Sequence, residues 1–251
     1  MEKPLQGTAV LVTGASSGIG AATARRLDSE GAAVALVARR RDRLDELASM
    51  IGGRALVVEA DVTDQAQAVA AVERTVAELG RLDILINNAG IMLLGPALDS
   101  PTEEWDRMIA LNVQASLYVT HAALPHLVSA AGDSARNVAD LIYISSTAGR
   151  VARPGGGVYS LTKFGIAAFA ESLRQELIAK RVRVGVVEPG TVHTELVTHL
   201  REDIRQAAEG QVDSIEALEP EDIADAVAYI VTRPRRVAVN ELLIRAAQQT
   251  W

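Results

Sequence analysis

Short runs of consecutive apolar residues alternate along the chain with longer stretches whose apolar positions recur at helical spacing. The short runs suit strands covered on both faces of a parallel sheet, and the longer stretches suit the helices that connect such strands. The predicted strands are Ala9–Val12, Ala33–Val37, Ala55–Glu59, Ile84–Asn87, Leu141–Ser145, Val182–Val187 and Glu241–Ile244. The predicted helices are Ala21–Glu30, Arg43–Ile51, Gln65–Leu79, Glu103–Ala130, Tyr159–Lys180 and Glu221–Val231. These elements fill the 251 residues, so the sequence predicts one doubly wound α/β domain over residues 1–251.

Two stretches do not fit this alternation. Gly132–Ala139 is polar and precedes a strand, so we expect a surface loop there. His193–Ala217 is charged, weakly apolar and follows Pro189-Gly190 at the end of a predicted strand. Open α/β sheets bind their ligands at the carboxyl ends of strands. We therefore expect this second segment to belong to a site and to act as a mobile lid.

Composition narrows the class of protein. Apolar residues make up 49% of the chain and aromatic residues only 3%, as expected of helices packed on aliphatic strands. The formal charge of −7, without a long basic stripe, argues against nucleic-acid binding. There is no cysteine, which excludes disulfides and thiolate chemistry and fits a reducing cytoplasm. Residues 1–7 lack the apolar core of a signal peptide, and no apolar run approaches the roughly 20 residues that span a bilayer. We expect a soluble cytoplasmic protein that does not bind membranes.

The four histidines predict no metal site. His121, His126, His193 and His199 show no metal-ligand spacing with carboxylates.

A glycine-rich segment, Thr13–Gly20, follows the first predicted strand and opens a helix. Gly14 allows a tight turn, and Gly18 and Gly20 let the backbone approach a pyrophosphate at the helix N-terminus. The alternative is a plain strand-to-helix turn. We assign the segment to cofactor binding, with Ser16, Ser17 and Ile19 completing it.

The end of the second predicted strand indicates which dinucleotide binds. Ala38, Arg39 and Arg40 stand where an acidic residue would accept bonds from a free ribose. Arg39 offers a planar fork to a 2′-phosphate, with Arg40 in support. These arginines lie just before a helix N-terminus, where the macrodipole disfavours cations, which favours an anionic ligand. The alternative is that they cover a surface turn.

Tyr159 and Lys163 stand one helical turn apart, thirteen residues after Ser146. Residues at i and i+4 share one helix face, and an ammonium beside a phenol lowers its pKa from about 10 toward a useful range for proton transfer. The pair alone is a weak signal, because such pairs arise often on exposed helices.

Together these motifs resemble the short-chain dehydrogenase/reductase family over essentially the whole chain. The residues that carry the resemblance, in order, are Thr13–Gly20, Asn87-Asn88-Ala89-Gly90, Asn112, Ser145-Ser146, Tyr159-Ser160-Leu161-Thr162-Lys163 and Pro189-Gly190. The stretches Ile86–Pro96, Ala123–Leu127 and Val239–Arg245 resemble, more narrowly, the NADP-dependent branch that contains clavulanic acid dehydrogenase and the short-chain 3-hydroxy acid dehydrogenases. The resemblance implies a Rossmann-type, seven-stranded parallel sheet and reversible hydride transfer between NADP(H) and a carbonyl or alcohol.

The resemblance also implies roles for individual residues. Tyr159 would be the general acid or base, Lys163 would bind the nicotinamide ribose, and Ser146 would hold the substrate oxygen. Asn112 would hold a water that links Lys163 to solvent, with an ordinary polar helix residue as the alternative. Asp61 would meet the adenine, with a helix N-cap as its competing role. The remaining cofactor contacts would come from Val62, Asn88, Ala89, Gly90, Pro189, Gly190, Thr191 and Thr194.

Three alternatives stay open from the sequence: an NAD-using dehydrogenase, a regulator that binds NADP without turnover, and a structural scaffold. We also expect a homo-oligomer, a tetramer or dimer, because Asn112–Ala130 and Tyr159–Lys180 carry more Ala and Leu than one sheet face needs. In the family these helices pair across a dimer interface. The ending Glu241–Trp251 lacks the Gly-Gly finish of many members.

Overall fold

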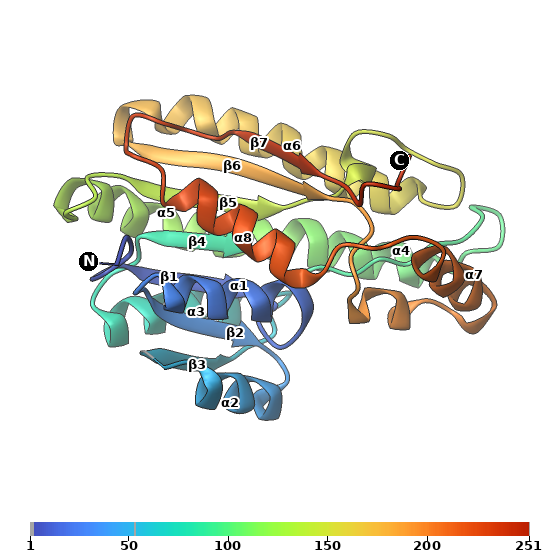
Figure 1. Cartoon of the computed structure of the whole chain (residues 1–251), viewed down its shortest axis with the longest axis horizontal. Coiled ribbons are helices and arrows are strands. Elements are labelled where there is room, and N and C mark those ends of the chain that lie inside the picture. Colours follow the sequence, from blue (N-terminus) through green and yellow to red (C-terminus); the bar gives the residue numbers. More distant parts are fainter. Residues whose placement is uncertain (1–2, 53, 251) are drawn as a thin grey trace.

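Within residues 3–52 and 54–250, which the computed structural model describes, seven parallel strands form one sheet in the order β3-β2-β1-β4-β5-β6-β7 (Figure 1). Met1, Glu2, Gly53 and Trp251 belong to the predicted domain but lie outside the described residues. The strands are β1 Ala9–Thr13, β2 Ala33–Ala38, β3 Ala55–Glu59, β4 Ile84–Asn87, β5 Ala139–Ile144, β6 Val182–Pro189 and β7 Glu241–Ile244. This confirms the predicted Rossmann-type fold, with strand ends shifted by up to two residues.

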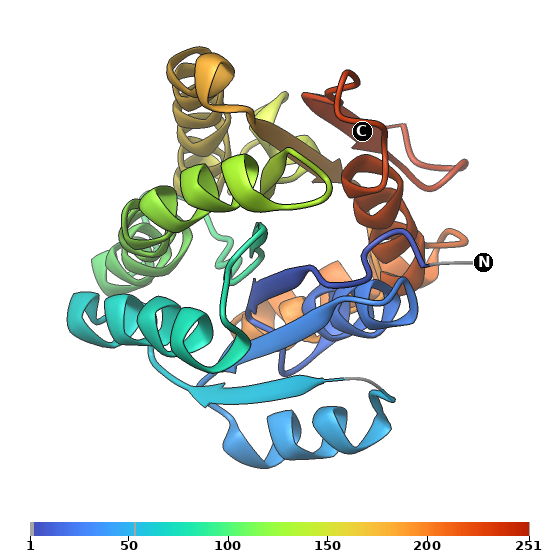
Figure 2. The same ribbon diagram turned by 90° about the vertical axis from the view of Figure 1, so that its left-hand side faces the viewer.

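Helices cover both faces of the sheet, as the end-on view in Figure 2 shows. One face carries α3, α5 and α6, and the other carries α1, α2 and α8. Their bounds are α1 Gly18–Ser29, α2 Arg41–Met50, α3 Gln65–Leu79, α5 Ala115–Asp133, α6 Gly157–Leu177 and α8 Pro220–Val231. Shorter elements are α4 Thr102–Met108, α7 Glu202–Asp213, the π-helical segment η1 Ile109–Gln114, and the 3-10 turns η2 Thr147–Gly149, η3 Ile178–Lys180 and η4 Glu195–His199. In Figure 1, α4 and α7 lie beyond the carboxyl ends of the strands.

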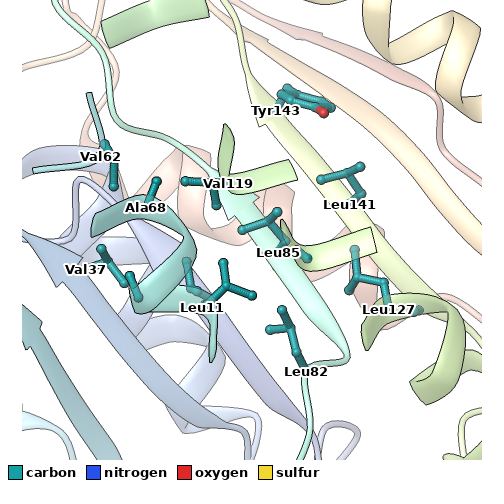
Figure 3. Packing of buried hydrophobic residues seen from close by; sticks show 14 of the residues in the cluster. Leu11, Val37, Val62, Ala68, Leu82, Leu85, Val119, Leu127, Leu141 and Tyr143 are labelled. Atoms are coloured by element: carbon teal, nitrogen blue, oxygen red, sulfur yellow. The ribbon is translucent and has the colours of Figure 1, made fainter. Parts of the chain in front are cut away.

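The core is divided by the sheet, because successive strand side chains point to opposite faces. Leu11 of β1 packs with α3 and α5, whereas its neighbours Val10 and Val12 pack with α1 and α8. Figure 3 shows Leu11, Leu85, Leu141 and Tyr143 facing the α3 and α5 side of the sheet. Strands buried on both faces need apolar residues throughout, and these strands therefore appear in the sequence as continuous apolar runs.

Local sequence explains where helices start and stop. Asp64 caps α3 by accepting from Gln67 N at 2.9 Å, and Gly80 ends it with a φ of +81°. Pro220 opens α8, flanked by a reciprocal capping pair of Glu219 and Asp222. These side chains bind the backbone groups that a helix end leaves unpaired.

The prediction of one regular helix over Glu103–Ala130 is wrong in its middle. The chain there is α4, the widened η1 turn and then α5, which extends to Asp133. The widened turn contains Asn112, whose side chain is bonded to the loop after β4. Single π turns inside helices are rare and often lie at functional sites.

The two irregular stretches are shorter than predicted. The loop before β5 spans only residues 134–138, since its Arg136 binds Asp140 at 2.6 Å and fixes the chain against β5. His193–Ala217 contains η4 and α7, so the prediction of an irregular segment is wrong for most of it. The sequence did not predict these helices, because the segment is weakly apolar. Only one face of α7 contributes apolar residues, among them Ala208 and Val212.

Among the described residues, no helix combines the length and the apolar character that crossing a membrane requires.

Candidate functional site

The turn between β1 and α1 requires its glycines for steric reasons. Gly14 and Gly18 adopt φ angles of +66° and +51°, a region that side chains disfavour. A Cβ on Gly20 would lie 2.3 Å from Gly14 O and 2.5 Å from Asn88 Nδ2. The turn thereby brings bare backbone to the N-terminus of α1, where an anion is stabilised by the free amides and the helix dipole.

A hydrogen-bonded clamp fixes this turn to the end of β4. Thr13 Oγ1 accepts from the backbone amides of Asn88 and Ala89 at 3.0 and 3.1 Å. The Asn88 side chain donates to Thr13 O at 2.9 Å and to Gly14 O at 3.3 Å. Asn88 therefore holds the glycine-rich turn in shape from a neighbouring strand.

A cavity of about 320 Å³ follows the carboxyl edge of the sheet from this turn to α6. Most of the predicted site residues line it: Gly14, Ser17, Gly18, Ile19, Arg39, Arg40, Asp61, Val62, Asn88, Ala89, Gly90, Ser146, Tyr159, Lys163, Pro189, Gly190 and Thr194. Four predicted residues do not line it, namely Ser16, Gly20, Asn112 and Thr191. Ser16 acts instead on Arg40, Gly20 makes room for the turn, and Thr191 lines a neighbouring cavity.

The sequence missed several residues of this first cavity. Ile91 follows the Asn88–Gly90 motif, and Ile144 is the last residue of β5, so their places after strands were an available signal. Glu195, Leu196 and His199 belong to η4. For these three, only the segment could be located from sequence, because a weakly apolar segment does not tell which side chains turn inward.

The two arginines after β2 differ in their surroundings. The Arg39 side chain is 72% exposed, and its Nη1 lies 3.8 Å from the Asp61 carboxylate. Arg40 donates to Ser16 Oγ at 3.1 and 3.0 Å, to Ser17 Oγ at 2.8 Å and to Glu195 at 2.8 Å. The guanidinium of Arg39 is thus the freer of the two for a ligand in the cavity.

Glu195 links η4 to the opposite wall of the cavity. Its carboxylate pairs with Arg40 at 2.8 Å and with Arg43 at 3.5 Å. The hydrogen bond from Arg40 lowers the pKa of Glu195, so its charge persists at neutral pH. Thr194 beside it lies against Gly18, where an added Cβ would meet its Cγ2 at 3.2 Å. The segment after β6 is therefore attached to both the glycine-rich turn and the β2 end.

Ser146, Tyr159 and Lys163 meet where β5 ends and α6 begins. Tyr159 and Lys163 are buried, with 7% and 8% exposure, and Lys163 Nζ lies 5.7 Å from the centre of the Tyr159 ring. Lys163 donates to Ile144 O at 2.9 Å. The helical spacing thus brings phenol and ammonium to one small volume, as the sequence indicated.

The pKa values of this pair depart from the simple expectation. Burial raises the pKa of Tyr159 to about 12, although the neighbouring Ser146 hydroxyl lowers it in part. Burial also lowers the pKa of Lys163 to about 8. Desolvation is the largest cause of both shifts, and no lowering of the Tyr159 pKa by Lys163 accompanies it, contrary to the expectation from the sequence.

Asn112 occupies η1 and does not line the first cavity. Its Oδ1 accepts from Ile91 N at 2.8 Å, and its Nδ2 donates to Ile91 O at 2.9 Å and to Thr162 Oγ1 at 3.2 Å. The side chain is thus occupied in fixing the loop after β4 to α6. The water-holding role of Asn112 stays a prediction.

A second cavity of about 320 Å³ adjoins the first one. Ser146, Tyr159, Gly190, Val192, Thr194 and Leu196 line both cavities. The walls of the second cavity are mainly apolar, formed by residues such as Met92, Leu94, Val151, Val197 and Val212. Ser146 and Tyr159 therefore stand at the junction of the two cavities.

No cluster of three or more His, Cys, Asp or Glu side chains suited to a metal ion occurs within residues 3–52 and 54–250.

Comparison with known proteins assigns the family. Residues 8–205 match the short chain dehydrogenase family. The chain belongs to that family. An uncharacterized oxidoreductase of Staphylococcus saprophyticus is 35% identical over 247 residues, which cover 96% of each chain. A glycine betaine reductase of Emericella nidulans is 37% identical over 244 residues, 96% of this chain, but the match spans only 19% of that longer protein.

A solved relative has the same fold. The closed form of a serine dehydrogenase complexed with NADP+ superposes with a TM-score of 0.87 and 36% identity, covering 97% of each chain. Membership of the short chain dehydrogenase family makes this chain an oxidoreductase. The narrower resemblance to the clavulanic acid dehydrogenase branch remains a prediction.

Proposed function

We propose that this short chain dehydrogenase transfers hydride reversibly between NADP(H) and a carbonyl or alcohol, most often reducing an aldehyde or ketone. The observation that carries the proposal is the junction of the two cavities at Ser146 and Tyr159. A cofactor in the first cavity and a carbonyl compound in the second would meet beside one proton-donating phenol.

The first cavity fits a dinucleotide phosphate. The bare backbone at Gly14 and Gly18 suits a pyrophosphate, and the exposed Arg39 suits a 2′-phosphate. Asp61 lies beside Arg39 at the adenine end, and Lys163 lies at the other end beside Tyr159. The chain binds NADP(H), in keeping with the NADP+ complex of its structural relative.

When bound, the cofactor supplies or accepts the hydride. The Tyr159 hydroxyl gives its proton to the carbonyl oxygen during reduction and takes it back during oxidation. The Ser146 hydroxyl donates to the same oxygen and stabilises the charge that develops on it. A Tyr159 pKa of about 12 keeps the phenol protonated at neutral pH, the form that reduction needs.

Lys163 binds the nicotinamide ribose, because its ammonium has donors beyond the one used by Ile144 O. It also holds the phenol in place from one helical turn away. Asn112 is a positioning residue, since it joins Ile91 at the cavity wall to Thr162 of α6. It fixes the distance between the β4 loop and the helix that bears Tyr159 and Lys163.

The direct experiment follows consumption of NADPH and of NADH against a panel of aldehydes, diketones and keto acids. The proposal expects oxidation of NADPH by at least part of the panel, with NADH used more weakly. If no compound promotes oxidation of either cofactor although NADPH binds, the regulator alternative is correct. Efficient use of NADH alone would make it an NAD-dependent dehydrogenase.

Assembly and location complete the proposal. We place the enzyme in the cytoplasm, where NADPH is available to such reductases, and propose that it assembles as a dimer or tetramer. The exposed apolar residues Leu161 and Phe164 of α6 support a covered helix face.

A further inference from the structure

Among the described residues that line the second cavity, Arg153 alone has a permanently charged side chain. Among the described residues, no hydrogen bond or ion pair engages its guanidinium. Most arginines of this chain are paired, such as Arg150 with Glu188 at 2.6 Å. A lone guanidinium beside apolar walls is an available partner for an anionic group of a ligand.

The backbone that carries Arg153 is held in place. Gly156 N donates to Arg153 O at 3.0 Å and closes a turn in which Gly155 has a φ of +78°. Gly95 N donates to Gly155 O at 2.9 Å, which joins this turn to the loop after β4. The side chain is therefore free at its head but presented from a fixed base, which lowers the entropy cost of binding.

Two polar side chains of the second cavity, Tyr159 and Arg153, differ in their exposure to solvent. Tyr159 is buried at the junction with the first cavity, whereas Arg153 is exposed to solvent. The lining of the same cavity also includes apolar side chains, among them Leu94 and Val151. A ligand that uses both polar side chains needs a carbonyl at its inner end, an aliphatic body and an anion at its outer end.

We propose that Arg153 binds the carboxylate of the substrate, and that the substrates are oxo acids whose carboxylate is separated from the reacting carbonyl by an aliphatic chain. The proposal rests on the proposed function. A carboxylate is favoured over a phosphate because a single cation and apolar walls match one negative charge, and the guanidinium fork fits two carboxylate oxygens.

The chemistry leaves this carboxylate unchanged. Hydride from NADPH would add to the carbonyl carbon and leave NADP+, the Tyr159 proton would pass to the carbonyl oxygen, and a hydroxy acid would result. Arg153 would contribute only to binding and orientation. Its removal should therefore lower kcat/KM for acids and leave kcat/KM for neutral carbonyl compounds unchanged.

The test compares succinic and glutaric semialdehydes with their methyl esters at saturating NADPH. We expect kcat/KM for at least one acid to exceed that for its ester by about tenfold or more, as one good charge-assisted contact allows. Arg153→Gln should abolish this difference and leave the ester rate unchanged, and Arg153→Lys should restore part of it. Arg74→Gln is the matched control, because Arg74 pairs with Glu78 on the outer side of α3.

Equal rates for acid and ester in the parent overturn the inference. So does an equal loss of both rates in Arg153→Gln, which would indicate a structural role. Calorimetric titration of the NADP+ complex with hexanoate and hexanamide separates this outcome from failure of the proposed function. Hexanoate binding that disappears in Arg153→Gln supports the anion site even if no carbonyl compound is reduced. Neutral carbonyl reduction without hexanoate binding overturns the anion site alone.

Discussion

The central residues of the site carry opposing electrostatic demands. In the proposed mechanism Lys163 must be charged to bind ribose hydroxyls firmly, yet burial lowers its pKa to about 8. In the same mechanism Tyr159 must donate a proton, and burial raises its pKa to about 12. Burial therefore makes the ammonium costly beside a protonated phenol, and a ribose in hydrogen-bond reach would stabilise that ammonium.

This cost predicts how stability depends on pH. Lys163 has a folded pKa of about 8 against an ordinary value of 10.5, so folding disfavours its charged form. The penalty is full below pH 8 and fades as pH rises through the interval to 10.5. Relative to Lys163→Met, the cofactor-free parent should gain roughly 3 kcal/mol of unfolding free energy between pH 7 and pH 10.5. Urea unfolding of both proteins across this range measures it, and parallel pH curves would contradict the buried charge.

Cofactor choice is a second prediction at this scale. NADPH should be preferred over NADH by about tenfold or more in kcat/KM, since one charge-assisted bond to a phosphate suffices for that ratio. Ala38→Asp with Arg39→Ile should reverse the order, because the carboxylate would accept bonds from a free ribose and repel a phosphate. Arg41→Gln is the control, because Arg41 pairs with Asp45 along α2. A parent that uses both cofactors equally would remove the phosphate role of Arg39.

Sequence could predict some of these side chains and not others. Helical spacing placed Tyr159 and Lys163 on one face, because that geometry is local. The different surroundings of Arg39 and Arg40 could not be predicted, since Arg40 is held by Glu195, a residue 155 positions away. The pKa shifts of Tyr159 and Lys163 could not be predicted from the sequence either, because desolvation depends on the complete packing around the pair.

At the scale of elements, strands were predicted well and helix details less so. Continuous apolar runs locate β1 or β6 because both faces are buried, and the strand ends then give the edge where a site lies. The π segment η1 was not predictable, since its cause is the bonding of Asn112 to Ile91 across the fold. The helix α7 was missed because its apolar face is narrow, although the segment was rightly expected near the site.

The segment His193–Ala217 supplies a prediction about motion. Glu195 attaches η4 to Arg40 and Arg43, so Glu195→Gln should speed amide hydrogen exchange in η4 of the cofactor-free protein. NADPH with a substrate analogue should slow exchange across the segment in the parent. Mass spectrometry of exchange measures both effects. Glu202→Gln serves as control, because Glu202 pairs with Arg205 within α7. If hydrogen exchange in this segment is the same with and without the ligands, the lid hypothesis is wrong.

For the whole molecule, the sheet places two cavities end to end at its carboxyl edge and leaves α6 partly uncovered. Leu161 and Phe164 are 62% and 43% exposed on α6. An apolar helix face of this kind is expected to pack against another copy of the chain.

Light scattering at micromolar concentration should therefore show a dimer or tetramer. Leu161→Glu with Phe164→Glu should shift the protein toward monomer, because two carboxylates would be buried in the interface. Met50→Glu changes an equally exposed apolar residue on α2, on the other side of the sheet, and should leave the assembly intact. A monomeric parent would contradict this expectation.

The most direct test of the whole account is the kinetics of Tyr159→Phe with NADPH and the best carbonyl substrate of the panel. The substitution keeps the buried ring but removes the proton that reduction requires. We predict a fall in kcat of about 10²-fold or more, with the Kd for NADPH within a few-fold of the parent by fluorescence titration. Tyr229→Phe, on the exposed side of α8, should behave like the parent. A Tyr159→Phe enzyme that reduces the substrate within a few-fold of the parental rate would contradict the assignment of the proton donor and, with it, the proposed mechanism.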